Sequence, residues 1–165
     1  MTLLSLKNVN RHGYDRQTLI NRMKTEEIYH QAGHLIRRAH QTATAIFMGE
    51  AKAFDLTPVQ FASLIVIRDN PGIEATKVAD MVYFDRSTIG NVLERLERKE
   101  LIMRQPGVHD RRTKALFLTP QGKVIIRKIS ARAPVITERI LEPLAENERK
   151  AFLDMLRRLT RNGSG

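Results

Sequence analysis

The sequence contains no cysteine and no tryptophan, and aromatic residues make up only 5% of its 165 positions. Without cysteine the chain can form no disulfide, thiolate nucleophile, cysteine redox sensor or sulfur-ligated zinc site. No apolar run approaches the ~18 residues of a membrane-spanning helix, and the N-terminal stretch lacks the long apolar segment of a signal peptide. These absences favour a cytoplasmic protein whose core is built from aliphatic side chains.

The charge balance is strongly basic. The chain has 28 Lys and Arg residues against 18 Asp and Glu residues, which gives a net charge of +10. This balance favours a polyanionic partner such as DNA, RNA or an anionic membrane face. Residues 120–165 hold ten basic and five acidic residues, whereas residues 57–119 hold ten and eight. A polyanion contact by the middle segment therefore depends on individually placed side chains rather than on bulk charge.

Two segments open with the sequence signals of a helix N-terminus. In LTPVQFASLIVIRDNPG, Thr57 can cap the helix, Pro58 fits its first position and Gln60 can complete a capping box. In TPQGKVIIRKI, Thr119 followed by proline repeats this arrangement. Further along the same helix, Pro134 is expected to kink or divide it.

The apolar period changes in the middle of the chain. A short helix over IEATKVADMV and a turn, YFD, lead to a second helix over RSTIGNVLERLERKE. LIMRQ and KALFL then predict two short strands joined by a loop that contains Pro-Gly. This order is typical of the winged helix-turn-helix, whose second helix lies in the major groove of DNA. Helical spacing over residues 26–54 and 146–161 adds helices on both sides. The expected fold class is mainly α with a small two-stranded β wing.

The loop RQPGVHDRRTK is interpreted as the wing. It gathers Arg104, Arg111, Arg112 and Lys114 within one short turn, where like charges repel one another. Their partners are expected to be phosphates and the floor of the minor groove, so the wing arginines are predicted to be unpaired within the chain.

Three stretches, LTPVQFASL, VADMVYFDRSTIGNVLERLERKELI and DRRTKALFLTPQG, resemble the MarR family of transcriptional regulators in order and spacing. The resemblance covers about residues 54–125, and its most specific part is Asp-x-Arg followed by Leu-Thr-x-x-Gly. It implies a two-fold dimer in which N- and C-terminal helices interlock. The implied organisation is an N-terminal arm over residues 1–25, a helical dimerisation region over 26–56 and 120–162, and a winged DNA-binding domain over 57–119.

The resemblance and the helix-turn-helix pattern together assign the DNA contacts. Small polar side chains at the start of the second helix can reach base edges or phosphates. In the wing, Arg112 matches the family position that enters the minor groove, and Asp110 matches the acid that orients it. The candidate DNA-binding residues are Arg86, Ser87, Thr88, Gly90, Asn91, Arg95, Asp110, Arg111, Arg112 and Lys114.

Each assignment has a structural alternative. Ser87 and Thr88 can serve only as caps of their helix, and Gly90 can serve only to avoid a clash. Arg95 can pair with neighbouring glutamates on the helix, and Arg86 can pair with Asp110 or another carboxylate of the wing.

The resemblance also implies a second site, because many family members bind a small aromatic or phenolic acid and then release DNA. His34, Arg38 and Gln41 are spaced four and three residues apart, hence on one helical face. Arg38 matches an arginine that meets the ligand carboxylate in some relatives, and its guanidinium suits that group. Phe61 or Tyr83 can supply a wall. The alternative is that this face is merely solvated.

A metal site is a weaker interpretation of the same helix. His30 and His34 are four residues apart with Glu26 or Glu27 a turn before them, which is a possible zinc pair. No further ligands are evident, so neither a metal nor another cofactor is predicted.

These patterns lead to one functional hypothesis. The chain is expected to be a homodimeric repressor that binds a pseudo-palindromic operator in double-stranded DNA. A small aromatic acid, such as a hydroxybenzoate or hydroxynicotinate, is expected to release it, and the stretch around Arg38 is similar to regulators of nicotinate and related aromatic catabolism. The protein would be cytoplasmic and nucleoid-associated. An effector-independent architectural protein and a metal-responsive repressor are the alternatives. No nucleophile–base pair, carboxylate cluster or glycine-rich phosphate loop indicates an enzyme.

Overall fold

The computed structural model describes residues 25–106 and 114–161. The chain divides into two compact units, residues 1–41 and residues 42–165, and each is described by itself. The first unit holds α2 (Thr25–Tyr29) and the beginning of α3 (Ala32–Glu50), which continues into the second. The single helix expected over residues 26–54 is therefore wrong in detail. A break follows Tyr29, and the separate 3-10 turn η1 (Lys52–Phe54) follows α3. The apolar spacing continues across these breaks, so the pattern did not reveal them.

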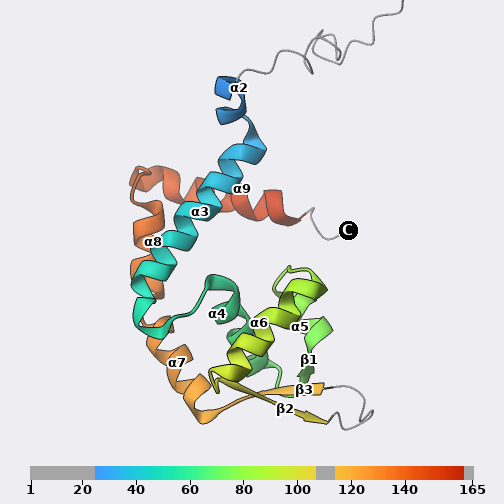
Figure 1. Ribbon diagram of the computed structural model, residues 1–165. Coiled ribbons are helices and arrows are strands. Elements are labelled where there is room, and N and C mark those ends of the chain that lie inside the picture. Colours follow the sequence, from blue (N-terminus) through green and yellow to red (C-terminus); the bar gives the residue numbers. More distant parts are fainter. Residues whose placement is uncertain (1–24, 107–113, 162–165) are drawn as a thin grey trace, which may run out of the picture. The chain divides into compact units, whose positions relative to one another are not determined.

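The second unit contains the helix-turn-helix and its hairpin (Figure 1). Its remaining elements are α4 (Pro58–Asp69), β1 (Ile73–Glu74), α5 (Ala75–Met81), α6 (Arg86–Arg98), β2 (Ile102–Pro106), β3 (Lys114–Leu118), α7 (Pro120–Ser130), α8 (Ala133–Leu141) and α9 (Glu146–Arg161). Among the residues described, no helix is both long and apolar enough to cross a membrane.

The predicted helix caps are confirmed. The Thr57 hydroxyl accepts from the Gln60 backbone N–H at 3.3 Å, and the Gln60 side chain accepts from the Thr57 N–H at 3.0 Å, which completes the capping box. Pro58 occupies the first helical position. Pro134 divides the C-terminal helix as expected, because α7 ends at Ser130 and α8 begins at Ala133.

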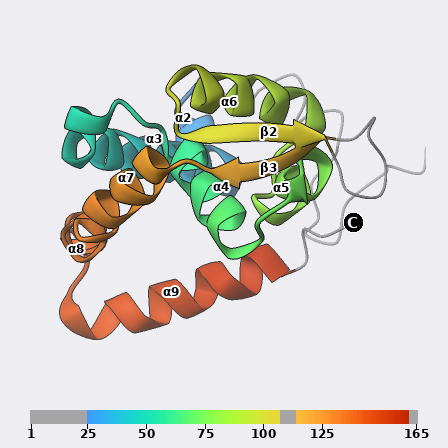
Figure 2. The same cartoon turned by 90° about the horizontal axis from the view of Figure 1, so that it is seen from below.

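The sheet has three strands rather than the two expected. β3 lies between β2 and β1, and both pairings are antiparallel. Figure 2 shows β2 and β3 side by side next to α4 and α6. The extra strand, β1, is only two residues long, too short for a period of two to show in the sequence. It is held by Gly72, which adopts a φ of 85° and donates its N–H to the Leu116 carbonyl at 2.9 Å.

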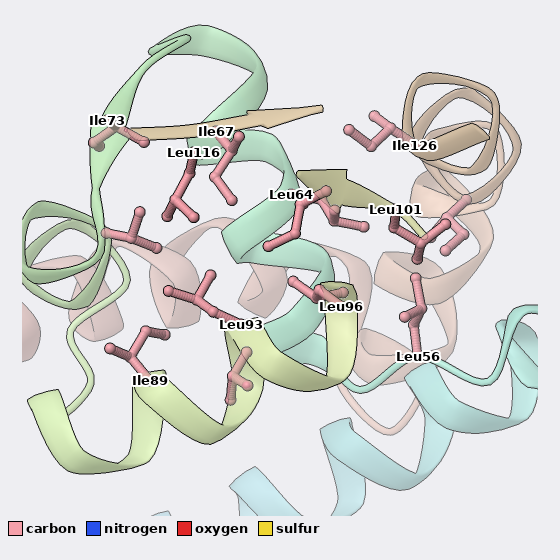
Figure 3. Close-up of a cluster of buried hydrophobic side chains, with 14 of the residues drawn as sticks. Leu56, Leu64, Ile67, Ile73, Ile89, Leu93, Leu96, Leu101, Leu116 and Ile126 are labelled. Carbon is pink, nitrogen blue, oxygen red and sulfur yellow. The ribbon is translucent and has the colours of Figure 1, made fainter. Parts of the chain in front are cut away.

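One apolar core joins the helix-turn-helix to the sheet and to α7. Figure 3 shows side chains from these elements drawn together, with Leu64 from α4, Leu93 and Leu96 from α6, Leu116 from β3 and Ile126 from α7. Each of these five is at most 2% exposed. Burying an aliphatic side chain of this size stabilises the fold by about 1.5–3 kcal/mol. The core therefore fixes α6 against the sheet, which leaves the opposite face of α6 free for function.

The start of α7 is joined tightly to the end of α6. Thr119 caps α7 by accepting the Gly122 N–H at 3.0 Å, and the same hydroxyl donates to the Glu100 carbonyl at 2.6 Å. A Cβ at Gly122 would stand 2.2 Å from the Leu101 carbonyl oxygen, so only glycine fits there. The Leu-Thr-x-x-Gly pattern is thus explained by capping and close backbone approach.

Ion pairs link the helices that surround the winged domain. The Glu50 carboxylate, at the end of α3, lies 2.5 Å from Arg139 and 3.5 Å from Arg132, and its side chain is only 15% exposed. The Lys99 ammonium, just after α6, pairs with Asp55 Oδ2 at 2.6 Å, and this contact holds the pKa of Asp55 below its usual value. These ion pairs thus attach the chain on both sides of the segment between α3 and α4 to other parts of the second unit.

Candidate DNA-binding surface

The helix-turn-helix consists of α5, a turn over residues 82–85, and α6. The turn closes when the Phe84 N–H donates to the Ala79 carbonyl at 3.0 Å. Tyr83 adopts a φ of 54°, in the left-handed region that favours glycine. Its side chain is 79% exposed. The turn therefore reverses the chain within a few residues and leaves an aromatic ring in solvent.

Asp85 is the N-cap of α6. Its Oδ1 accepts from the Thr88 N–H at 2.8 Å and from the Ser87 hydroxyl at 2.6 Å. These hydrogen bonds, the one from the Ser87 side chain first, lower the pKa of the Asp85 carboxyl to about 2. The interpretation that Ser87 and Thr88 are themselves the caps is wrong, because both residues lie in the first turn and donate to Asp85.

One face of α6 is buried and the other carries most of the predicted DNA contacts. Ile89, Val92, Leu93 and Leu96 face the core. Predicted contacts on the helix that are exposed are Arg86, Ser87, Asn91 and Arg95, whereas Thr88 and Gly90 are half-buried. The helix thus brings the six predicted residues into a segment ten residues long, with hydroxyl, amide and guanidinium groups available to a ligand.

Gly90, Arg86 and Arg95 of α6 are not engaged in internal packing. A Cβ at Gly90 would meet nothing within 4 Å, so the alternative that glycine avoids a clash there is wrong. Within the described part of the chain, no ion pair involves Arg95. Arg86 lies 4.0 Å from Asp80, at the limit of an ion pair, and both side chains are largely exposed. These groups are free to meet another molecule.

The hairpin differs from expectation at one arginine. Arg104 on β2 is paired within the chain, since its Nε lies 3.0 Å from Glu97 Oε2 on α6. The alignment is that of an ion pair rather than of a hydrogen bond. The prediction that the wing arginines lack partners is therefore wrong for Arg104. Lys114 is exposed at the start of β3. Asp110, Arg111 and Arg112 lie outside the described residues.

The predicted ligand residues on α3 belong to the first unit. In that unit Arg37, a residue that the sequence pattern did not single out, links His34 and Gln41. Its guanidinium donates to Gln41 Oε1 at 3.0 Å and lies 3.5 Å from His34 Nδ1. The Nε2 atom of His34 is shielded from solvent without a hydrogen-bond partner among the described residues, and Tyr29 packs edge-on against its ring at 5.3 Å. Arg38 is exposed.

The two predicted wall residues belong to the second unit. Phe61 on α4 is half-buried and packs against Phe47, with ring centroids 5.8 Å apart. Tyr83 lies in the turn before α6. Within residues 25–106 and 114–161, no group of three or more His, Asp or Glu side chains could hold a metal ion.

Three residues that form these polar contacts were missed by sequence reasoning. Asp85 had a readable signal, because an aspartate three residues before the Thr88 N–H is a common cap arrangement. Glu97 as the partner of Arg104 had none, since the pairing depends on how β2 lies beside α6. Arg37 is spaced like a helical neighbour of both His34 and Gln41, but so is Arg38, so spacing alone could not show which arginine makes the contacts.

Comparison with known proteins decides the family. The MarR family model matches residues 56–114, which span the helix-turn-helix and the hairpin up to β3. The HTH-type transcriptional repressor NicR of Pseudomonas putida is 33% identical over 133 residues, which cover 81% of this chain and 84% of NicR. The chain belongs to the MarR family. Like its relatives, this MarR-family protein is a transcriptional regulator and not an enzyme.

Solved structures agree with this assignment. BpsR of Bordetella bronchiseptica, whose DNA binding is regulated by 6-hydroxynicotinic acid, is 32% identical with a TM-score of 0.73, over 80% of this chain and 94% of BpsR. The repressor CouR, bound to a 23-mer DNA duplex, is 28% identical with a TM-score of 0.73, over 84% of this chain and 99% of CouR. These structures share the winged-helix fold found here.

Proposed function

We propose that this MarR-family regulator is a homodimeric repressor that binds a pseudo-palindromic operator. The observation that carries the proposal is the free face of α6, where Ser87, Asn91 and Arg95 are exposed around a Gly90 with open space beside it. Hydroxyl, amide and guanidinium groups read base edges, and a helix without a Cβ at one position can approach them closely. Arg86, Thr88 and Lys114, with Asp110, Arg111 and Arg112 of the wing, complete the proposed contacts.

Pairing of two copies through the terminal helices is the second part of the proposal. α9 has no buried residue within the chain, and Met155 and Leu159 are 57% and 58% exposed. Leu35 and Ile36 on α3 are each 49% exposed. Apolar surface of this kind gains about 25 cal/mol for each Å² removed from water, so a second copy is a favourable cover. Two winged domains related by a two-fold axis would read half-sites about one helical turn apart, roughly 34 Å.

A small aromatic acid is the proposed effector that releases the repressor. Support comes from α3, where His34, Arg38 and Gln41 offer an imidazole, a guanidinium and an amide. Arg38 would bind the ligand carboxylate. The regulation of BpsR by 6-hydroxynicotinic acid makes hydroxynicotinates and hydroxybenzoates the first candidates. Such a repressor would act in the cytoplasm, associated with the nucleoid through its operators.

The test is a fluorescence-anisotropy titration of the full chain against labelled duplex from upstream of its own gene. Salt concentration is fixed and stated, because phosphate contacts make the affinity salt-dependent. The titration is repeated with benzoates, hydroxybenzoates, nicotinate, 6-hydroxynicotinate and zinc, and light scattering gives the oligomeric state. Tight binding that one aromatic acid reverses is the expected result. Reversal by zinc alone, or by no compound of the panel, would contradict the effector assignment. Equal affinity for any duplex would contradict the proposal that the protein recognises a specific operator sequence.

A further inference from the structure

Tyr83 is the most exposed large apolar side chain among the described residues, at 79%. Two neighbours in the sequence are also exposed: Met81, the last residue of α5, at 50%, and Phe84, in the turn between α5 and α6, at 41%. Monomeric proteins scatter single apolar residues over their surfaces, but a local group of three is more informative. The question is what this group contacts.

The fold itself gives no reason for a tyrosine at this position. Its φ of 54° lies in the left-handed region, which costs free energy for any residue with a side chain and costs glycine almost nothing. The Tyr83 backbone N–H donates to the Asp80 carbonyl at 3.3 Å, but within the described residues no hydrogen bond or ring contact involves its side chain. Backbone geometry therefore favours glycine here, and the tyrosine side chain contributes nothing to the interior that would offset the difference.

The position of the turn connects this group to the DNA-binding surface. In a helix-turn-helix the first helix crosses the DNA backbone, while the N-terminal residues of the second enter the major groove. Tyr83 stands two residues before Asp85, the N-cap of α6, and three before the exposed Arg86. A side chain that extends from this turn lies where the protein passes from backbone to groove.

We propose that Tyr83 is a DNA-positioning residue whose ring packs on the deoxyribose–phosphate backbone beside the groove and whose hydroxyl donates to a phosphate oxygen. This inference rests on the proposed operator binding, and it gives Tyr83 to DNA rather than to the effector pocket. A phenol has the required chemistry, since its ring covers the apolar sugar while its O–H is a neutral donor. Phosphate contacts of this kind fix orientation and register without reading sequence.

A neutral donor leaves a distinctive experimental signature. Lysine and arginine contacts release counterions, so their loss lowers the slope of log K against log salt by about one for each phosphate contact. A tyrosine hydroxyl releases none. Its loss should lower the affinity by the same factor at every salt concentration, and equally on operator and unrelated duplex.

The experiment compares Tyr83→Phe, Tyr83→Gly and a matched control, Tyr29→Phe, in the full chain. Tyr29 is also an exposed tyrosine, but it belongs to the first unit. Anisotropy titrations at four salt concentrations, on operator and on unrelated duplex, are combined with thermal melts. Tyr83→Phe is expected to weaken both complexes roughly three- to tenfold with an unchanged salt slope. Tyr83→Gly is expected to bind more weakly still, yet to melt about 2 °C higher because the backbone strain is relieved. Tyr29→Phe should match the wild type.

Four outcomes would overturn the inference. Wild-type affinity in both Tyr83 variants would leave operator binding intact and remove Tyr83 from it. Normal DNA affinity with a lost effector response would assign Tyr83 to the pocket. A loss that coincides with dissociation of the dimer would assign the exposed group to a protein contact. A folded wild-type chain that binds no duplex would refute the proposed function together with this inference.

Discussion

Gly90 lies in the second turn of α6, where glycine weakens a helix and nothing nearby requires it. Glycine in a helix interior costs about 1 kcal/mol relative to alanine. Gly90→Ala should therefore raise the free energy of unfolding by about 0.5–1 kcal/mol. It should also weaken operator binding, since the added methyl group would face the groove in the proposed complex. Urea unfolding and anisotropy titration measure the two effects. Greater stability together with undiminished affinity would show that α6 does not approach DNA at this position.

Asp85 makes the α6 cap dependent on pH. Its folded pKa of about 2 lies below the ordinary value of 3.8, so the cap stabilises the fold fully above pH ~4. That contribution should be lost as the pH falls from about 4 towards 2. Asp85→Asn keeps an acceptor at the N-cap but cannot titrate, so it should flatten this part of the profile. Urea midpoints of both proteins between pH 6 and pH 2 measure the difference. Parallel profiles would show that the Asp85 hydrogen bonds are absent in solution.

At the scale of elements, the packing at the junction of β2, β3 and α7 requires a glycine at position 122. The Cβ of an alanine at Gly122 would lie 2.2 Å from the Leu101 carbonyl oxygen, so α7 or the chain after α6 must shift. Gly122→Ala should lower the free energy of unfolding by roughly 1–3 kcal/mol, the usual cost of overpacking. Thermal melts compare the same glycine-to-alanine change in two helices. Gly122→Ala should lower the melting temperature, and Gly90→Ala should raise it. A Gly122→Ala protein as stable as the wild type would show that the close contact relaxes without cost.

The elements that sequence reasoning predicted correctly carry their own local signals. The Thr57 and Thr119 caps, the division at Pro134 and the amphipathic α6 each depend on residues within a few positions of one another. β1 depends on pairing with β3, a segment far along the chain, and the Glu97–Arg104 pair depends on how β2 lies beside α6. The wing prediction failed at Arg104 because contacts between elements cannot be read from the sequence. An excess of arginine indicated a polyanion, but only the placement of β2 beside α6 shows that Arg104 already has a carboxylate partner.

At the scale of the whole molecule, the effector response tests how the α3 site acts on DNA binding. Arg38→Ala should keep operator affinity and lose release by the aromatic acid, because the carboxylate loses its bidentate partner. Arg37→Ala is the matched control, since it removes contacts to His34 and Gln41 but leaves Arg38 in place. Anisotropy titrations of the preformed DNA complex with effector measure the response. If Arg37→Ala alone loses it, the carboxylate contact belongs to Arg37.

The second prediction at this scale concerns the wing. Arg112→Ala should weaken operator binding strongly, while the oligomeric state and the melting temperature stay near those of the wild type. The expected reason is loss of a minor-groove contact and of one released counterion, which should also lower the salt slope by about one. Light scattering and thermal melts provide the control for folding. Unchanged operator affinity would remove Arg112 from the contact.

The close fit of Gly122 against Leu101 also determines where the second unit can bend. Rotation about the connection between β3 and α7 would drive the first turn of α7 into that carbonyl, and the Thr119 hydroxyl ties the same turn to Glu100. We therefore expect α7 to keep its orientation against the winged domain. The helical path is interrupted between Ser130 and Ala133, ahead of Pro134, so any bend is expected there. Arg132 lies at that interruption, and its ion pair with Glu50 at 3.5 Å connects it to the end of α3.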